Sequence, residues 1–311
     1  MWNLEGRDEV WLMSPELFGL LVFILLGCVS NTSWLLAYRQ AIESSFINRI
    51  LPLAMLFLVS LGEISFKALL SYSGVYYLLA VVFMVGVYLC CCRFLGVGGH
   101  NESVSIALNT SFSNLVLVGV PLFLWLGNES VISLIYMIIP FHSFVLFMCA
   151  SLLAAVRGAK KVKRALPNVP LLSWAILVGF VLSKLQVWQG VEVAYLKSST
   201  VYVLQFGTIW VLSARLTANR LNVQGIKAAF IISLTKVVLM PAFFFVVLSP
   251  FSLTMTKQIC LLAGLPIGLN TLGFSGKCRQ EVNYALSLAL VISSLLSLIT
   301  IPLIVYYFGA F

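Results

Sequence analysis

Charged side chains are scarce in this chain, and their scarcity excludes an ordinary soluble protein. Only 9% of the 311 residues are charged and 61% are hydrophobic, whereas a soluble domain has about 25% charged residues. Most of the chain falls into apolar runs of roughly 17 to 25 residues, long enough to cross about 30 Å of hydrocarbon as helices. The sequence therefore predicts an all-α integral membrane protein.

Acidic residues are rare within the predicted helices. Asp8 is the only aspartate and lies outside them, which excludes ion pumping through a pair of intramembrane aspartates. Glu63 and His142 are the candidates for coupling to an ion. Glu63 has an alternative role as an interfacial partner of Lys67, and His142 has one as a packing residue. Uniport, proton exchange and sodium symport all stay open.

Enzyme and metal signatures are missing. The sequence has no His-Glu-x-x-His, phosphate-binding loop or Gly-x-Ser-x-Gly motif, and its two histidines are far apart. The seven cysteines show no metal-ligand spacing. We therefore expect no enzyme activity, no cofactor and no metal. The net charge of +9 indicates membrane topology rather than a nucleic-acid partner.

The apolar runs predict about ten membrane-spanning helices, with boundaries uncertain by a few residues. They are expected at 15–37, 46–64, 74–93, 104–126, 130–156, 169–187, 198–216, 226–248, 257–275 and 282–307.

Basic residues alternate between the predicted connections. Thirteen of the 19 lie on one side, five lie on the other, and Lys236 lies inside a helix. The positive-inside rule then places both termini on the non-cytoplasmic side of the membrane, which we expect to be a bacterial plasma membrane. The basic segment 157–168 is the expected cytoplasmic linker between a first repeat at 1–156 and a second at 169–311. Each half holds five helices, and this odd number requires the second half to be inverted. Membrane lipids are expected partners.

Two matched motifs indicate a site in the middle of the membrane. Gly119-Val120-Pro121 lies in the fourth predicted helix, close to Asn114, and Gly264-Leu265-Pro266 lies in the ninth, close to Asn270. Proline removes a backbone donor and breaks helices, and broken helices in corresponding positions of inverted repeats indicate a substrate site. The asparagines could donate hydrogen bonds to a carboxylate there. The alternative is that both kinks and both asparagines serve helix packing.

Lys236 is the only charge deep inside a predicted helix, about ten residues from either end. A lysine at that depth costs about 2.5 to 3.5 kcal/mol, so it needs a partner or a wet cavity. It is a candidate for attracting the substrate anion or exchanging a proton. Alternatively, it bonds carbonyls that are freed near Pro241.

The stretches FSNLVLVGVPL (112–122) and AGLPIGLN (263–270), together with Leu51-Pro52, Lys236 with Pro241 and Thr300-Ile301-Pro302-Leu303, resemble the auxin efflux carrier family. That family includes plant PIN carriers and bacterial permeases. The resemblance implies ten helices in two inverted five-helix repeats, with the fourth and ninth crossing at their proline breaks. It also implies that Asn114 contacts a substrate carboxylate, and that a transport domain moves like an elevator against a scaffold of the first, second, sixth and seventh helices. A homodimer through that scaffold stays open.

The sequence thus favours a secondary transporter for a small organic anion. Its expected binding residues are Asn114, Gly119, Pro121, Lys236, Gly264, Pro266 and Asn270. The alternative is a membrane sensor that binds a ligand on the same fold without moving it. A channel is disfavoured, because no ring of like charges is visible.

Overall fold

The computed structural model describes residues 26, 36–62, 66–93, 99–126, 128–156, 171–189, 191–218, 225–271 and 278–308. Most of the first predicted helix, the linker 157–168 and Glu63 lie outside these residues.

The described part of the chain is helical, apart from short connections and one isolated bridge between Ser113 and Ile267. Five of its helices are long and apolar enough to cross a membrane, at Tyr38–Leu61, Ser71–Arg93, Glu129–Val156, Ile226–Leu248 and Gln280–Tyr307. Their outward side chains are also apolar: Leu53, Val246 and Leu298 are 66%, 69% and 72% exposed. Such surfaces are costly in water and suit lipid, so the fold is compatible with a membrane-embedded protein.

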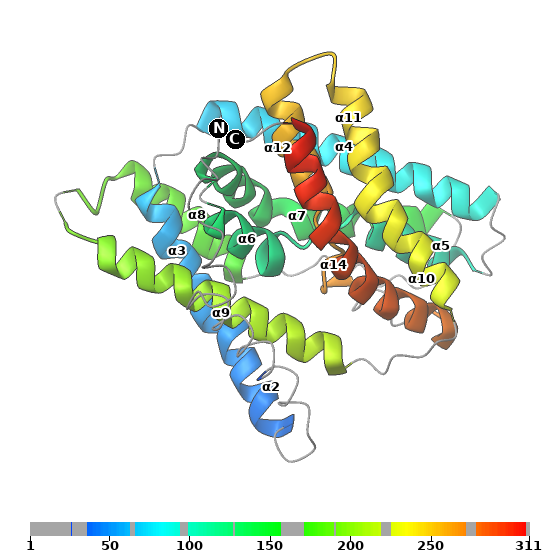
Figure 1. Cartoon of the computed structure of the whole chain (residues 1–311), viewed down its shortest axis with the longest axis horizontal. Helices are drawn as coiled ribbons and strands as arrows, with labels where there is room; N and C mark the ends of the chain where they lie inside the picture. The colour runs from blue at the N-terminus through cyan, green and yellow to red at the C-terminus, as the bar shows by residue number, and fades with distance from the viewer. Residues whose placement is uncertain are drawn as a thin grey trace, which may run out of the picture.

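The helices form two groups, and α6 and α7 of the second group contact α9 and α8 of the first (Figure 1). We call the first the α3 group; it consists of α2 (Leu36–Ser45), η1 (Phe46–Ile50), α3 (Leu51–Leu61), α8 (Leu171–Lys184) and α9 (Ala194–Ala218). We call the second the crossing group; it consists of α4 (Phe66–Arg93), α5 (His100–Ser111), η2 (Leu115–Gly119), α6 (Val120–Trp125), α7 (Glu129–Val156), α10 (Ile226–Leu234), η3 (Thr235–Leu239), α11 (Met240–Leu248), α12 (Leu253–Ala263) and α14 (Gln280–Phe308).

Close backbone approach holds the α3 group together. A Cβ atom on Gly179 of α8 would lie 2.9 Å from the carbonyl oxygen of Leu56 and 3.0 Å from Val59 of α3. A larger residue at this position would therefore separate the two helices. Arg39 of α2 also donates a hydrogen bond to the carbonyl of Ala214 on α9, at 3.3 Å.

Three prolines follow a five-residue π-helical segment. Pro52, Pro121 and Pro241 lie in the first turn of α3, α6 and α11, directly after η1, η2 and η3. In each case the residue before the proline donates to the carbonyl five residues back, as Val120 does to Leu115. The wider turn suits a proline, whose ring would clash with the carbonyl of a regular α-helical turn.

Several predicted boundaries differ from the structure. The second predicted helix, 46–64, begins earlier, because α2, η1 and α3 form one continuous helix over 36–61. Its added first part carries Arg39 and Glu43, so an apolar run could not indicate it. The fourth and ninth are interrupted, at residues 112–114 and between Ala263 and Thr271. The eighth, predicted at 226–248, has those boundaries in the structure, although it contains η3.

Candidate functional site

Two backbone breaks meet inside the crossing group. The first follows α5 and covers residues 112–114, and the second follows α12, between Ala263 and Thr271. The amide of Asn114 donates to the carbonyl of Pro266 at 2.8 Å, and the amide of Gly268 donates to the carbonyl of Phe112 at 3.0 Å. Each break therefore supplies hydrogen-bond partners for the other, which hydrocarbon could not do. We call this arrangement the crossing.

Ser113 lies at the centre of the crossing. Its Oγ accepts hydrogen bonds from Tyr76 of α4 at 3.1 Å and from Lys236 of η3 at 2.7 Å. Its carbonyl oxygen lies 3.2 Å from Nε2 of His142 on α7. Three elements distant in sequence thus hold one serine, and the sequence analysis missed it because a single serine in an apolar stretch forms no pattern.

Lys236 links the two breaks. Besides Ser113, its Nζ donates to the carbonyl of Ala263, at the end of α12, at 2.8 Å, and lies 3.1 Å from the sulfur of Met240. The side chain is fully buried. No acidic side chain forms an ion pair with it among the residues that the structure describes. The predicted need for a partner is therefore met by backbone and hydroxyl oxygens.

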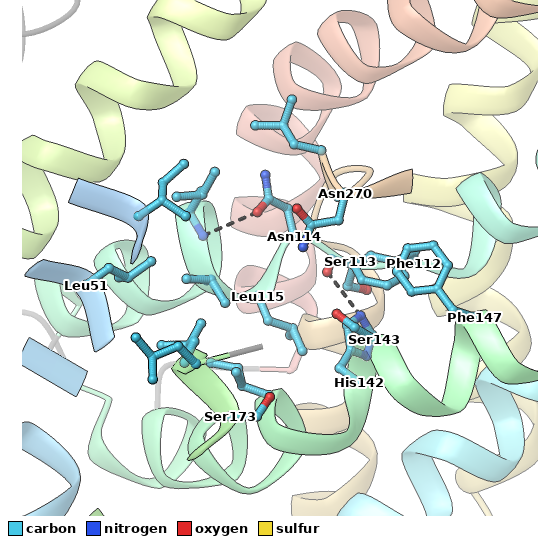
Figure 2. A pocket seen from close by; sticks show the side chains of 18 of the residues that line it. Leu51, Phe112, Ser113, Asn114, Leu115, His142, Ser143, Phe147, Ser173 and Asn270 are labelled. Atoms are coloured by element: carbon cyan, nitrogen blue, oxygen red, sulfur yellow. Dashed lines mark hydrogen bonds between the residues drawn. The ribbon is translucent and has the colours of Figure 1, made fainter. Parts of the chain in front are cut away.

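A cavity of about 400 Å³ lies beside the crossing, within the usual range of small-molecule sites. It is lined by the crossing with the start of η2, the η1 segment with the start of α3, the middle of α7 and the start of α8 (Figure 2). It therefore lies between the two helix groups. The residues that line it are Ile47, Asn48, Leu51, Phe112–Leu117, Ile139, His142, Ser143, Phe147, Leu171–Ser173 and Gly268–Asn270, and none is an aspartate, glutamate, lysine or arginine.

Two side chains of the lining hold buried polar atoms that have no hydrogen-bond partner among the described residues. Asn114 accepts a hydrogen bond from the amide of Leu117 through Oδ1, at 3.2 Å, and so caps η2, while its Nδ2 is unpaired. His142 is bonded through Nε2, while its Nδ1 is unpaired. An unsatisfied buried polar atom costs about 1–3 kcal/mol, so both indicate a partner that arrives from elsewhere.

The structure places the predicted site residues in two sets. Asn114, Asn270 and His142 line the cavity, and Figure 2 shows them around Ser113. The remaining described ones, Gly119, Pro121, Lys236, Gly264 and Pro266, do not line it. They belong to the packing around the cavity and not to its wall, so the placement gives them no direct contact with a ligand there.

The two glycines serve close packing. A Cβ atom on Gly119 would lie 2.9 Å from Cδ1 of Leu265 in the second break, and one on Gly264 would lie 2.9 Å from Cδ1 of Ile304 on α14. The absence of a side chain at Gly119 therefore lets η2 approach the second break.

The break expected at Pro121 is displaced. The chain leaves helical geometry at residues 112–114, and Pro121 lies in the first turn of α6, where a missing amide hydrogen costs little. The π-helical η2 continues into α6 without a gap, so Pro121 interrupts nothing. In the ninth predicted helix, Pro266 does lie inside the break.

Side-chain contacts hold α5 in place on either side of this site. In its last turns, Thr271 donates to Oδ1 of Asn109 at 2.7 Å. At its start, Arg279 forms a two-pronged hydrogen bond with Glu102, at 2.6 Å and 2.9 Å. The hydrogen bonds from Arg279 lower the pKa of the Glu102 carboxyl below its ordinary value, although burial of the carboxyl acts in the opposite direction. The start of α5 is therefore fixed to the segment that enters α14.

Metal-binding groups are not found in this region. No group of three or more histidine, cysteine, aspartate or glutamate residues that could hold a metal lies within the described ranges. The hydrogen-bonding groups at the cavity are amides, hydroxyls and one imidazole, which suit an organic ligand.

No family model matches this chain, and no curated protein matches it. Its class is therefore defined by fold and site. It is an all-α protein with helices apolar enough to span a membrane, and it has a cavity beside two broken helices that cross.

Proposed function

We propose that this chain is a secondary transporter that resembles the auxin efflux carriers and moves a small organic anion, a carboxylate, across the membrane. The observation that carries the proposal is the cavity of about 400 Å³ at the junction of the two helix groups, directly beside the crossing. A site at such a junction changes its access when one group moves against the other, which alternating access requires.

The charge around the cavity supports an anion. The described residues of the lining include no acidic side chain, and Lys236, which is positive in its protonated form, lies behind the wall and bonds Ser113. Nδ2 of Asn114 is an unpaired donor on a residue of the wall. A carboxylate accepts hydrogen bonds and is attracted by a positive charge in an environment of low dielectric constant. A cation would find neither form of support.

The larger architecture forms part of the same proposal. The antiparallel pairing of Ser113 with Ile267 is what two inverted five-helix repeats, crossing at their fourth and ninth helices, would produce. In this proposal the α3 group contains the scaffold and the crossing group moves as an elevator. The membrane is a bacterial plasma membrane, with both termini on its non-cytoplasmic side.

The test is uptake of radiolabelled monocarboxylates into liposomes that contain the purified full-length chain. Asn114→Asp keeps the oxygen that caps η2 at Leu117 but replaces the Nδ2 donor with a negative oxygen, so we expect uptake to fall at least about tenfold. Asn101→Asp is the matched control, because Asn101 is exposed at the start of α5, and it should retain uptake within about twofold.

Undiminished uptake by the Asn114→Asp protein would reject this site. Saturable binding of carboxylates by the unmodified protein without any uptake would reject transport and favour a sensor.

A further inference from the structure

His142 has a defined tautomer. Its Nε2 lies 3.2 Å from the carbonyl oxygen of Ser113, and a carbonyl can only accept a hydrogen bond. Nε2 therefore carries the hydrogen, and in the neutral ring Nδ1 is left as an acceptor. The ring is held in place by Phe112, with centroids 4.3 Å apart, and by Tyr76, with centroids 5.9 Å apart.

The acceptor on His142 has no hydrogen-bond partner in the part of the chain that the structure describes. Nδ1 is covered and unpaired, and the whole side chain is only 4% exposed. Since His142 lines the cavity, a ligand that fills the cavity is the natural source of a donor.

Asn114 holds an unpaired hydrogen-bond donor, whereas His142 holds an unpaired acceptor. The hydrogen bond from Leu117 fixes its Oδ1, so the unpaired Nδ2 faces away from η2 as a donor. The two residues are connected through Ser113, which precedes Asn114 in the chain and bonds His142. Two residues of the lining, which are linked through Ser113, therefore hold an unpaired donor and an unpaired acceptor, and this combination suits a ligand carrying both kinds of group.

We propose that His142 is a specificity-determining residue, which selects carboxylates that carry a neutral hydrogen-bond donor, a hydroxyl or an amide N–H, beside the carboxylate. The carboxylate bonds Asn114, and the donor bonds Nδ1 of His142. The donor is neutral because the described residues of the lining include no acidic side chain to pair with an ammonium group. This inference rests on the proposed function, since it assumes that the cavity binds a carboxylate.

The experiment compares matched acids that differ by one hydroxyl: lactate with propionate, and mandelate with phenylacetate. Dissociation constants are measured by ligand-dependent thermal stabilisation of the purified full-length protein. In each pair, the hydroxy acid that fits the cavity should bind about threefold to tenfold more tightly, which corresponds to one additional hydrogen bond.

Two substitutions of His142 separate its two nitrogens. The amide of glutamine occupies the position of Nε2, so His142→Gln keeps the donor to Ser113 and removes the acceptor. The amide of asparagine occupies the position of Nδ1, so His142→Asn keeps an acceptor there and loses the bond to Ser113. We expect the hydroxy-acid preference to fall to about one in His142→Gln and to persist in His142→Asn.

Ser198→Ala is the control, because Ser198 is exposed on α9 and its hydroxyl donates to the carbonyl of Ala194 in the same helix. It should keep the preference. The inference is overturned if the unmodified protein binds both members of each pair equally, if His142→Gln keeps the preference, or if His142→Asn or Ser198→Ala loses it. If no carboxylate binds the unmodified protein at all, the proposed function itself fails, and the two failures are thereby distinguished.

Discussion

Nζ of Lys236 lies 2.7 Å from Oγ of Ser113, and this hydrogen bond joins η3 to the first backbone break. The same ammonium donates to the carbonyl of Ala263 at the second break. Lys236 can thus contribute in two separable ways, through hydrogen bonds that tie the breaks together and, in its protonated form, through a positive charge behind the cavity.

Two substitutions of Lys236 should separate these contributions. Lys236→Gln keeps a hydrogen-bond donor without the charge, and Lys236→Met removes both. We expect both variants to bind carboxylates about tenfold more weakly, because the positive potential is lost. Only the methionine variant should also unfold at a clearly lower temperature, since the Ala263 carbonyl then loses its partner. Lys227→Met, on an exposed position of α10, is the control. Unchanged carboxylate binding in both variants would show that the charge has no role.

Gly268 should tolerate no side chain. A Cβ atom there would lie 2.4 Å from Cδ1 of Phe112, whose ring is held by His142 and Phe147. We expect Gly268→Ala to lower the free energy of unfolding by about 1–3 kcal/mol, the usual cost of overpacking. Gly86→Ala is the control, because nothing lies within 4 Å of its added methyl group. Thermal denaturation measures both, and equal midpoints would contradict the tight crossing.

The hydroxyl of Thr271 should stabilise the crossing from the side of α5. It donates to Oδ1 of Asn109 at 2.7 Å and is fully buried. Thr271→Val preserves the shape but leaves Asn109 Oδ1 without this donor, at a cost of about 1–3 kcal/mol. Thr200→Val is the comparison, because the hydroxyl of Thr200 bonds only its own helix at Leu196. Chemical denaturation in detergent should show a loss in the first variant alone.

The pair formed by Glu102 and Arg279 should make stability depend on pH. The folded-state pKa of Glu102 lies below its ordinary value of 4.5, so the folded chain binds a proton there less readily than the unfolded chain. The pair therefore stabilises the fold above about pH 4.5, and this contribution disappears as the pH falls through the lowered pKa.

Glu102→Gln should accordingly lower the melting temperature at pH 7 and show a smaller further decrease toward pH 4 than the unmodified protein. Glu129→Gln is the control, since Glu129 is 87% exposed and lies 4.0 Å from Lys197, a geometry that contributes little. An equal decrease in melting temperature between pH 7 and pH 4 for Glu102→Gln and for the unmodified protein would contradict the expectation.

The amount that the sequence could predict depended on the physical origin of each feature. Lengths of apolar runs predicted the positions of most described helices, because spanning the membrane sets a minimum apolar length. The same signal could not reveal that the second helix begins at Leu36, because its added part contains Arg39 and Glu43. Nor could it locate the first break, because Pro121 fits the start of a helix after a π-helical turn, while Ser113 and Asn114 carry the break itself.

The cavity lining was only partly accessible to sequence reasoning. Asn114 and Asn270 lie close to recognisable Gly-x-Pro motifs, and His142 is one of only two histidines in the sequence. The sequence therefore marks all three as candidate site residues. Asn48 and Ser173 come from helices with no motif, and their place at the cavity depends on how α3 and α8 pack. Close packing of helices at positions such as Gly179 is a tertiary property, which a single sequence does not display.

The hydrogen bonds described at the crossing all join elements of the crossing group. Tyr76, Lys236 and His142 reach Ser113 from helices of the crossing group. The opposite wall supplies the apolar Ile47, Leu51 and Leu172 and the polar Asn48 and Ser173, and Nδ2 of Asn48 bonds Ser44 within the α3 group. Sliding along this wall would therefore exchange van der Waals contacts and break none of these hydrogen bonds. A ligand bound to Asn114 could thus move together with the crossing group past the α3 group, while the hydrogen bonds around Ser113 stay intact.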